Sequence, residues 1–222
     1  MKDVKWGIIG VGDVTELKSG PAFNKVPNSQ IVNVMRRNLE KAKDYAERHG
    51  ISKFTNNADD LLNDDEINAI YIATPPSSHA EYTIKAAKAG KHVYVEKPMA
   101  TTHSECLRMI EACKHNGVKL FVAYYRRELD YFKKIKELIE SKAIGDIKYV
   151  DIKLFLPPNK DDFNKENLPW RVKKEIAGGG YFYDLASHQF DFLDFLFEPI
   201  KLVNGVSTNQ LKLYEVEDIV SA

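Results

Sequence analysis

The sequence predicts an α/β protein, with a helix-covered parallel sheet in residues 1–122 and an incomplete α+β domain in residues 123–222. Three observations support this fold class. Apolar runs with strand character alternate with helical patterns through the first 145 residues, which is typical of a parallel sheet. Glycines stand where three of the helical patterns end, and closely spaced glycines follow the first apolar run directly.

The strands and helices of the first domain follow from composition and end signals. Each expected strand is rich in Val, Ile or aromatic residues, and the glycines Gly50, Gly90 and Gly117 are suited to left-handed helix ends. The expected strands are Val4 to Ile9, Ile31 to Met35, Ala69 to Ala73, His92 to Glu96 and Val118 to Tyr124. The clearest helices are Leu39 to His49, Ser78 to Ala89 and Thr102 to Asn116.

The second domain has a different pattern. A further helix is predicted from about Glu128 to Ser141, followed by a long strand from Ile147 to Leu156 and an irregular stretch rich in proline and charge. The three glycines 178–180 then open a helix that runs to about Phe197. Two more strand-like segments follow, the last from Glu215 to Ala222.

Composition points to a globular protein that acts on small molecules. Of 222 residues, 44% are hydrophobic, and 32 basic residues balance 32 acidic ones, so no net field favours nucleic acid or an anionic membrane. The N-terminal residues lack the apolar core of a signal peptide, and no apolar run is long enough to span a bilayer, so we expect a cytoplasmic protein. Cys106 and Cys113 are seven positions apart in a helical pattern, roughly 10 Å along the axis, and are expected to be reduced.

The glycines after the first strand predict a dinucleotide-binding, Rossmann-type domain. Gly10 and Gly12 allow a tight turn and a close backbone approach to a pyrophosphate, which would lie at the helix N-terminus beginning with Asp13 and Val14. The same glycines occur in structural turns, and Thr15 stands where the motif has a third small residue. Pro21 is expected to interrupt the helix that follows.

The end of the second strand bears on the choice of cofactor. A site for NAD places a carboxylate there on the adenosine ribose, whereas a site for NADP places a cation on the 2′-phosphate. This sequence has Arg36 and Arg37 and no carboxylate, which favours NADP over NAD. The alternative for either arginine is a solvated basic turn.

Further candidates follow the third, fourth and fifth strands, whose carboxyl ends should converge on one crevice with the glycine loop. Each has a structural alternative: a rigid proline turn, a residue of a first helical turn, or a solvated lysine or arginine. The candidates are Thr74, Pro75, His79, Glu96, Lys97, Tyr124, Arg126 and Arg127.

Asp184 and His188 are four apart on the helix after the three glycines, so they share one face, with Asp191 a turn further on. A carboxylate can orient an imidazole and support its proton transfer. The alternatives are an ordinary surface pair or a metal site, and two evident ligands argue against metal. We therefore predict no bound metal.

Together these residues resemble the family of glucose–fructose oxidoreductase, inositol dehydrogenase and rhizopine-catabolism oxidoreductases (Gfo/Idh/MocA). The resemblance extends over essentially the whole chain. It rests on the glycine loop, Ala73-Thr74-Pro75-Pro76, the specific tripeptide Glu96-Lys97-Pro98, and the three glycines followed by Asp184 and His188.

The resemblance implies NAD or NADP as cofactor and a second domain built on an open, largely antiparallel sheet. It implies that Lys97 and His188 contact the reacting oxygen of a sugar, polyol or related substrate, while Asp184 binds substrate or orients His188. From this we expect hydride transfer between nicotinamide and a secondary alcohol or carbonyl, with catalytic roles for Lys97, His188 and Asp184 and substrate contacts from Tyr124 and Arg126. Two alternatives stay open: a cofactor-binding sensor without turnover, and a dihydrodiol- or biliverdin-type reductase.

The resemblance also implies about a hundred further residues in members of the family. We therefore expect this chain to be an N-terminal portion and Glu215 to Ala222 to be a strand whose neighbours are absent. Such a sheet favours association into a homo-oligomer through the second domain.

Overall fold

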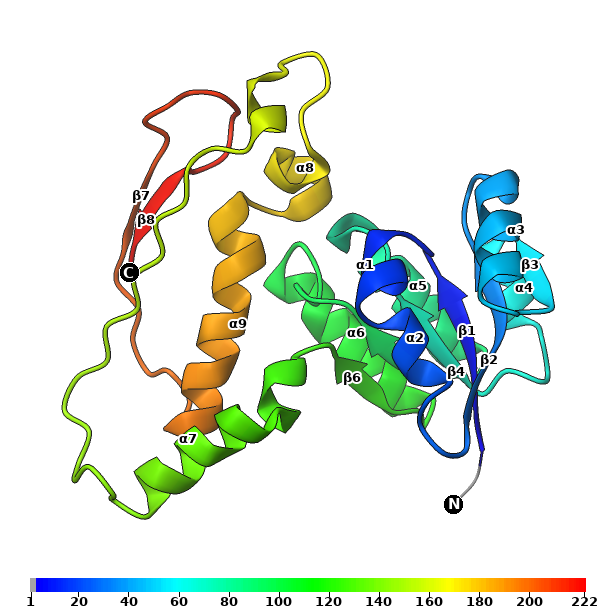
Figure 1. Ribbon diagram of the computed structural model, residues 1–222, viewed down its shortest axis with the longest axis horizontal. Helices are drawn as coiled ribbons and strands as arrows, with labels where there is room; N and C mark the ends of the chain where they lie inside the picture. The colour runs from blue at the N-terminus through cyan, green and yellow to red at the C-terminus, as the bar shows by residue number, and fades with distance from the viewer. Residues whose placement is uncertain (1–2) are drawn as a thin grey trace. The chain divides into compact units, whose positions relative to one another are not determined.

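The computed structural model describes residues 3–222, which divide into two compact units, residues 3–123 and 124–222 (Figure 1). In the first unit, strands and helices alternate along the chain, as the apolar pattern predicts. Its strands are β1 (Val4–Ile9), β2 (Ser29–Met35), β3 (Lys53–Thr55), β4 (Ala69–Ile72), β5 (His92–Val95) and β6 (Leu120–Val122). Its helices are α1 (Asp13–Leu17), α2 (Gly20–Phe23), α3 (Leu39–Arg48), α4 (Ala58–Leu62), α5 (His79–Lys88) and α6 (His103–His115).

The six strands form one parallel sheet in the order β3-β2-β1-β4-β5-β6. The chain starts in the middle, moves outward to β3, and then returns across β1 to build the other half from β4. The strand order therefore reverses between β1 and β4, where open α/β sheets bind their ligands. The predicted Rossmann-type architecture is confirmed.

Both faces of the sheet are covered by helices. On one face, Ile9 and Ile72 pack with Leu61 of α4, Ala86 of α5 and Met109 of α6. On the other face, Ile8 and Tyr71 pack with residues of α3. Neighbouring residues of one strand thus enter different cores, which is why these strands are apolar on both sides.

Sequence and structure agree closely on the long elements of the first unit and differ on two short ones. β3 and α4, between α3 and β4, were not predicted, because three to five residues give too little periodicity. The predicted interruption near Pro21 is present: α1 ends at Leu17 and α2 begins at Gly20.

The second unit contains α7 (Asp130–Glu140), α8 (Lys174–Ala177), α9 (Tyr181–Leu196), and the antiparallel strands β7 (Val206–Thr208) and β8 (Ile219–Ser221). In Figure 1, α7 meets the carboxyl end of α9, where the rings of Phe132 and Phe192 lie 4.5 Å apart and the Lys136 ammonium donates to the carbonyl of Phe195. The α+β character and the antiparallel pairing are as expected.

Two expectations for the second unit are wrong. Residues 147–156 form no strand, because a strand requires a partner and the described chain pairs none with this segment. The expected strand from Glu215 to Ala222 is shorter, Ile219–Ser221, and it has β7 as a neighbour.

Candidate cofactor and active site

The turn after β1 makes a close approach to the turn after β4. Gly10 has φ +98°, and a Cβ atom there would lie 2.6 Å from Cγ2 and 2.9 Å from the backbone nitrogen of Thr74. Glycine satisfies both requirements because it has no side chain and tolerates positive φ. Gly10 therefore allows the turn after β1 to contact the turn after β4 at the point where the strand order reverses.

Gly12 leaves the other side of this turn open. A Cβ atom at Gly12 would meet nothing within 4 Å, so a pyrophosphate can approach the backbone. The Thr15 hydroxyl accepts a hydrogen bond from the Gly12 N–H and donates one to the Gly12 carbonyl, both at 2.8 Å. Thr15 is fully buried. The threonine that replaces the third small residue of the motif therefore stabilises the turn through these hydrogen bonds, and its side chain does not obstruct the open side of the turn. These features fit a dinucleotide cofactor.

The close packing that a third glycine would provide is found at Gly20. A Cβ atom there would collide with the carbonyl of Thr15 and the hydroxyl of Tyr45, which itself donates to that carbonyl at 3.1 Å. Glycine at position 20 thus lets the start of α2 approach α1 and α3 closely.

His79 connects two of the candidate loops from inside. Its side chain has no exposed surface, and its ring nitrogens lie 2.7 Å from the carbonyl of Thr74 and 3.0 Å from that of Pro98. Burial lowers the pKa of His79. The sequence predicts a cofactor contact for His79, and the structure shows its ring between the turn after β4 and the turn after β5.

A polar cluster lies at the carboxyl end of β5. Glu96 is half-buried, accepts a 2.5 Å hydrogen bond from the Tyr71 hydroxyl, and accepts the Lys97 N–H at 3.2 Å. Burial raises the pKa of Glu96, and these hydrogen bonds partly offset that effect. Lys97 follows directly at the carboxyl end of β5, one strand from β4.

The two arginines after β2 differ in environment. Arg36 is half-buried, and its N–H donates to the carbonyl of Thr55 at the end of β3. Arg37 is exposed. Arg36 is therefore the arginine whose backbone is fixed at the end of the sheet.

In the second unit, Asp184 and His188 lie on α9, as predicted. His188 is buried, and its ring makes edge contacts with Tyr124 and Tyr125 at centroid distances of 6.0 and 5.5 Å. The Asp184 carboxylate accepts a hydrogen bond from the Arg171 guanidinium at 3.3 Å. An imidazole and a carboxylate one turn apart can together move and balance a proton.

The other charged candidates of this unit have structural partners. Arg127 donates from Nε to both Asp191 oxygens at 2.9 and 3.0 Å, a two-point ion pair that joins the segment before α7 to α9. Asp191 therefore pairs with Arg127, whereas Asp184 accepts from Arg171. The guanidinium of Arg126 lies over the Phe132 ring, 5.8 Å from its centroid.

Sequence reasoning missed Tyr71, which donates to Glu96, Ser19, whose hydroxyl lies 2.8 Å from that of Tyr71, and Arg171, which donates to Asp184. Tyr71 belongs to an apolar strand pattern, and nothing in its spacing distinguishes a core tyrosine from one that contacts a carboxylate. Arg171 lies in an irregular stretch without periodicity.

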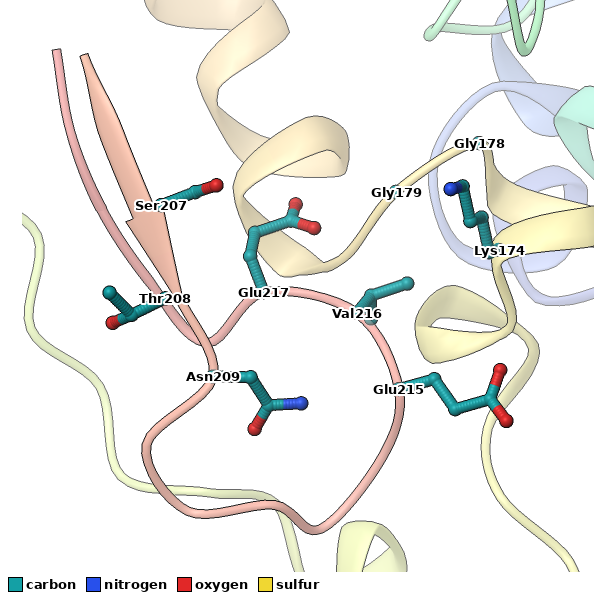
Figure 2. Close-up of a pocket in the computed structure, with 9 residues that line it drawn as sticks. All are labelled: Lys174, Gly178, Gly179, Ser207, Thr208, Asn209, Glu215, Val216 and Glu217. Atoms are coloured by element: carbon teal, nitrogen blue, oxygen red, sulfur yellow. The ribbon is translucent and has the colours of Figure 1, made fainter.

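A shallow pocket of about 290 Å³ lies at the start of α9 (Figure 2). Gly178 and Gly179 form one side, and Glu217 points toward them from the segment before β8. Its lining contains none of the predicted site residues. Within residues 3–222 there is also no cluster of three His, Cys, Asp or Glu side chains suited to a metal ion, and no helix long and apolar enough to cross a membrane.

Comparisons with known proteins cover both units. The family described as "Oxidoreductase family, NAD-binding Rossmann fold" matches residues 4–124, and the GFO/IDH/MocA C-terminal domain matches residues 132–222. Oxidoreductase P35 from Formosa agariphila is 48% identical over 93% of this chain and 64% of its own length.

Solved structures give the same result. The WlbA dehydrogenase from Bordetella pertussis, in complex with NADH and UDP-GlcNAcA, is 30% identical with a TM-score of 0.87, over 99% of this chain and 62% of its own. Levoglucosan dehydrogenase, in complex with NADH and levoglucosan, is 29% identical with a TM-score of 0.80, over the same shares. The chain thus spans 62 to 64% of the length of these three proteins.

Proposed function

Because this chain belongs to the GFO/IDH/MocA oxidoreductase family, we propose that it transfers a hydride between a nicotinamide cofactor and a secondary alcohol or carbonyl carbon of a sugar, polyol or related small molecule. The observation that carries the proposal is the close approach of Gly10 to Thr74 where the strand order reverses, with Lys97 following the next strand. Relatives that bind NADH with sugar ligands support the substrate class.

The first unit would hold the cofactor. The open backbone at Gly12 and the N-terminus of α1, with Asp13 and Val14, would face the pyrophosphate. Thr74, Pro75 and Glu96 would line the nicotinamide side, because they end the neighbouring strands. Arg36 would favour NADP by pairing with the 2′-phosphate. When bound, the cofactor supplies or accepts the hydride.

The chain's own residues would manage charge and the proton. The Lys97 cation would stabilise negative charge on the reacting oxygen, and His188 would take or return the hydroxyl proton, since imidazole titrates near neutrality. Asp184, one turn before His188, would balance the imidazolium or hold a neighbouring substrate hydroxyl. Tyr124 and Arg126 are the proposed further substrate contacts.

The proposal predicts that Lys97→Ala and His188→Ala each lower turnover by on the order of 10² to 10⁴, because each removes a positioned proton or charge carrier. Sugars, polyols and dihydrodiols are first screened with NADP and NAD for a change in absorbance at about 340 nm, the band of reduced nicotinamide. The variants are then assayed on the best substrate, with cofactor affinity measured separately.

Lys114→Ala, on the solvent-exposed end of α6, is the matched control and should change turnover little. Near-normal turnover in both site variants contradicts the assignment. Loss in Lys97→Ala alone makes lysine the proton carrier. Cofactor binding without turnover of any substrate favours a sensor.

A further inference from the structure

We propose that Tyr71 is a positioning residue that fixes the Glu96 carboxylate and, with it, the turn that presents Lys97. In this arrangement, Ser19, Tyr71 and Glu96 form one hydrogen-bonded chain that connects the glycine-loop helix to the lysine. The significance for catalysis rests on the proposed function of Lys97, whereas the positioning itself does not.

The chain of hydrogen bonds is continuous. The Ser19 and Tyr71 hydroxyls are 2.8 Å apart, and the Tyr71 hydroxyl donates to Glu96 Oε1 at 2.5 Å. Because that donation uses the phenolic hydrogen, Ser19 is the donor to Tyr71, and its hydroxyl oxygen also lies within 3.3 Å of the Val14 carbonyl, the longer of the two contacts. The second carboxylate oxygen, Oε2, accepts the N–H of Lys97. Each oxygen of Glu96 thus has a defined partner.

The aromatic surroundings fix the tyrosine ring. Tyr71 is fully buried in β4, stacks on Tyr94 of β5 with centroids 5.2 Å apart, and contacts the ring of Phe23 at 5.1 Å. A ring packed on two sides can present its hydroxyl in only one direction, so the hydrogen bond to Glu96 requires no further ordering of the side chain.

The elements joined by this chain are those that would contact the cofactor. Ser19 lies at the break between α1 and α2, just after the glycine loop, and Glu96 ends β5. The hydrogen bonds therefore connect the break between α1 and α2 with the Glu96 carboxylate and with the backbone N–H of Lys97. No other side chain described for this part of the molecule bonds both the Ser19 hydroxyl and Glu96.

The charges around Glu96 are limited. Lys97 and Lys18 both lower its pKa, Tyr94 lies near it, and burial raises its pKa most strongly. The Tyr71 hydrogen bond stabilises the ionised carboxylate. If this hydrogen bond is removed, Glu96 stays buried but its carboxylate loses one donor. The pKa of Glu96 should therefore rise further.

The test uses Tyr71→Phe, which keeps the ring and removes the hydroxyl. The carboxyl carbon of Glu96 is followed through a pH titration by NMR in the 222-residue chain labelled with ¹³C-glutamate, and assigned with Glu96→Gln. NADPH and NADH affinities are measured by fluorescence. We expect the pKa of Glu96 to rise and cofactor affinity to fall by roughly tenfold, as for loss of a hydrogen bond to a charged group.

Tyr94→Phe is the matched control, because it removes a hydroxyl from the stacked partner ring without removing a donor to Glu96. It should leave the pKa of Glu96 unchanged and the cofactor affinity within about twofold of the wild-type value, because no hydrogen bond to Glu96 is lost. An unchanged Glu96 pKa in Tyr71→Phe, or equal effects of the two variants, overturns the proposal.

If Tyr71→Phe does not fold, Ser19→Ala tests the proposal instead. It removes the hydroxyl that donates to Tyr71, at the end of the hydrogen-bonded series farthest from Glu96. A smaller rise in the pKa of Glu96 is then expected, and no change overturns the proposal. A wild-type chain that binds neither NADPH nor NADH contradicts the proposed function, and the NMR titration still decides whether Tyr71 positions Glu96.

Discussion

Arg36 stands at the end of β2, with its backbone held by the carbonyl of Thr55, whereas Arg37 next to it is exposed. In a dinucleotide site, this end of the second strand faces the adenosine ribose. A guanidinium there can form an ion pair with two hydrogen bonds to the 2′-phosphate of NADP. With the neutral ribose hydroxyls of NAD it can form only weaker hydrogen bonds without the charge attraction. The half-buried arginine is therefore the residue that should determine cofactor choice.

We predict that the wild-type chain binds NADP more tightly than NAD and that Arg36→Asp reverses the order. Loss of a charge-assisted pair should weaken NADP binding by roughly 10- to 100-fold. Fluorescence titration of both reduced cofactors measures the effect, with Arg37→Asp as the neighbouring control. Equal or tighter binding of NAD by the wild type contradicts the prediction.

Glu16, on the glycine-loop helix α1, is held by the end of α3. Its carboxylate accepts hydrogen bonds from Arg48 and lies 2.9 Å from His49 Nε2. Chiefly through the Arg48 hydrogen bond, these partners lower the pKa of Glu16 from 4.5 to about 2. A carboxylate whose folded pKa is depressed stabilises the fold above its unfolded pKa and loses that contribution as pH falls through the folded value.

We therefore predict that Glu16 makes stability depend on pH between about 4.5 and about 2. Glu16→Gln should lower the free energy of unfolding at neutral pH and flatten its decline in this window, because the glutamine does not titrate. Urea denaturation at a series of pH values measures both effects. Glu40→Gln, at an exposed position of α3, is the control, and parallel pH curves for wild type and Glu16→Gln would refute the prediction.

At the scale of elements, the sequence predicts what periodicity and end signals encode. Gly50, Gly90 and Gly117 all adopt positive φ after α3, α5 and α6, so these helix ends were predictable to within about one residue. Residues 147–156 show the limit. Their apolar and aromatic composition favours a strand, but pairing depends on a neighbour elsewhere in the fold, and the exposed Tyr149 and Phe155 have none in the described chain.

The start of α9 depends on a contact that no local pattern reveals. Glu217, 37 residues after Gly180, accepts the Gly180 N–H at 2.8 Å, as the glutamate of a capping box does within one helix. A Cβ atom at Gly180 would lie 2.5 Å from the Glu217 carbonyl, so the two segments touch at the backbone. Figure 2 shows the Glu217 side chain directed toward the glycine turn.

We predict that Glu217→Ala lowers the free energy of unfolding by about 1–2 kcal/mol, the usual cost of a lost N-terminal cap. Glu217→Gln keeps an acceptor and should lose less. Urea denaturation followed by circular dichroism measures the change, and Glu215→Ala, at an exposed position two residues earlier, is the matched control. Equal losses for Glu217→Ala and Glu215→Ala would show that the contact does not stabilise α9.

At the scale of the whole molecule, the sequence predicts which elements carry the candidate site residues but not the side chains that those residues contact. The Gly10 turn, Thr74 and Lys97 follow from the rule that ligands bind at strand ends, and Asp184 with His188 follows from helical spacing. The contacts of Tyr71 with Glu96, and of Asp191 with Arg127, join residues 25 and 64 positions apart. Such contacts depend on tertiary structure, which strand and helix periodicity does not specify.

The second unit exposes much apolar side-chain surface. Val206 on β7 is 68% exposed, and Tyr149 and Phe155 on the extended segment are 80% and 87% exposed. The two-stranded sheet also has open edges, which are templates for pairing with another chain. Large exposed apolar groups gathered in one unit are typical of an association surface.

We therefore predict that the chain forms homo-oligomers through the second unit and that Phe155→Glu together with Val206→Lys shifts it toward the monomer. Burying a charge in an apolar interface is costly, so the dissociation constant should rise by at least roughly 100-fold. Sedimentation velocity over a concentration series measures the state of association. Leu17→Glu is the control, because Leu17 is 83% exposed but belongs to the first unit. A wild-type chain that stays monomeric throughout, or an equal shift caused by Leu17→Glu, contradicts association through this surface.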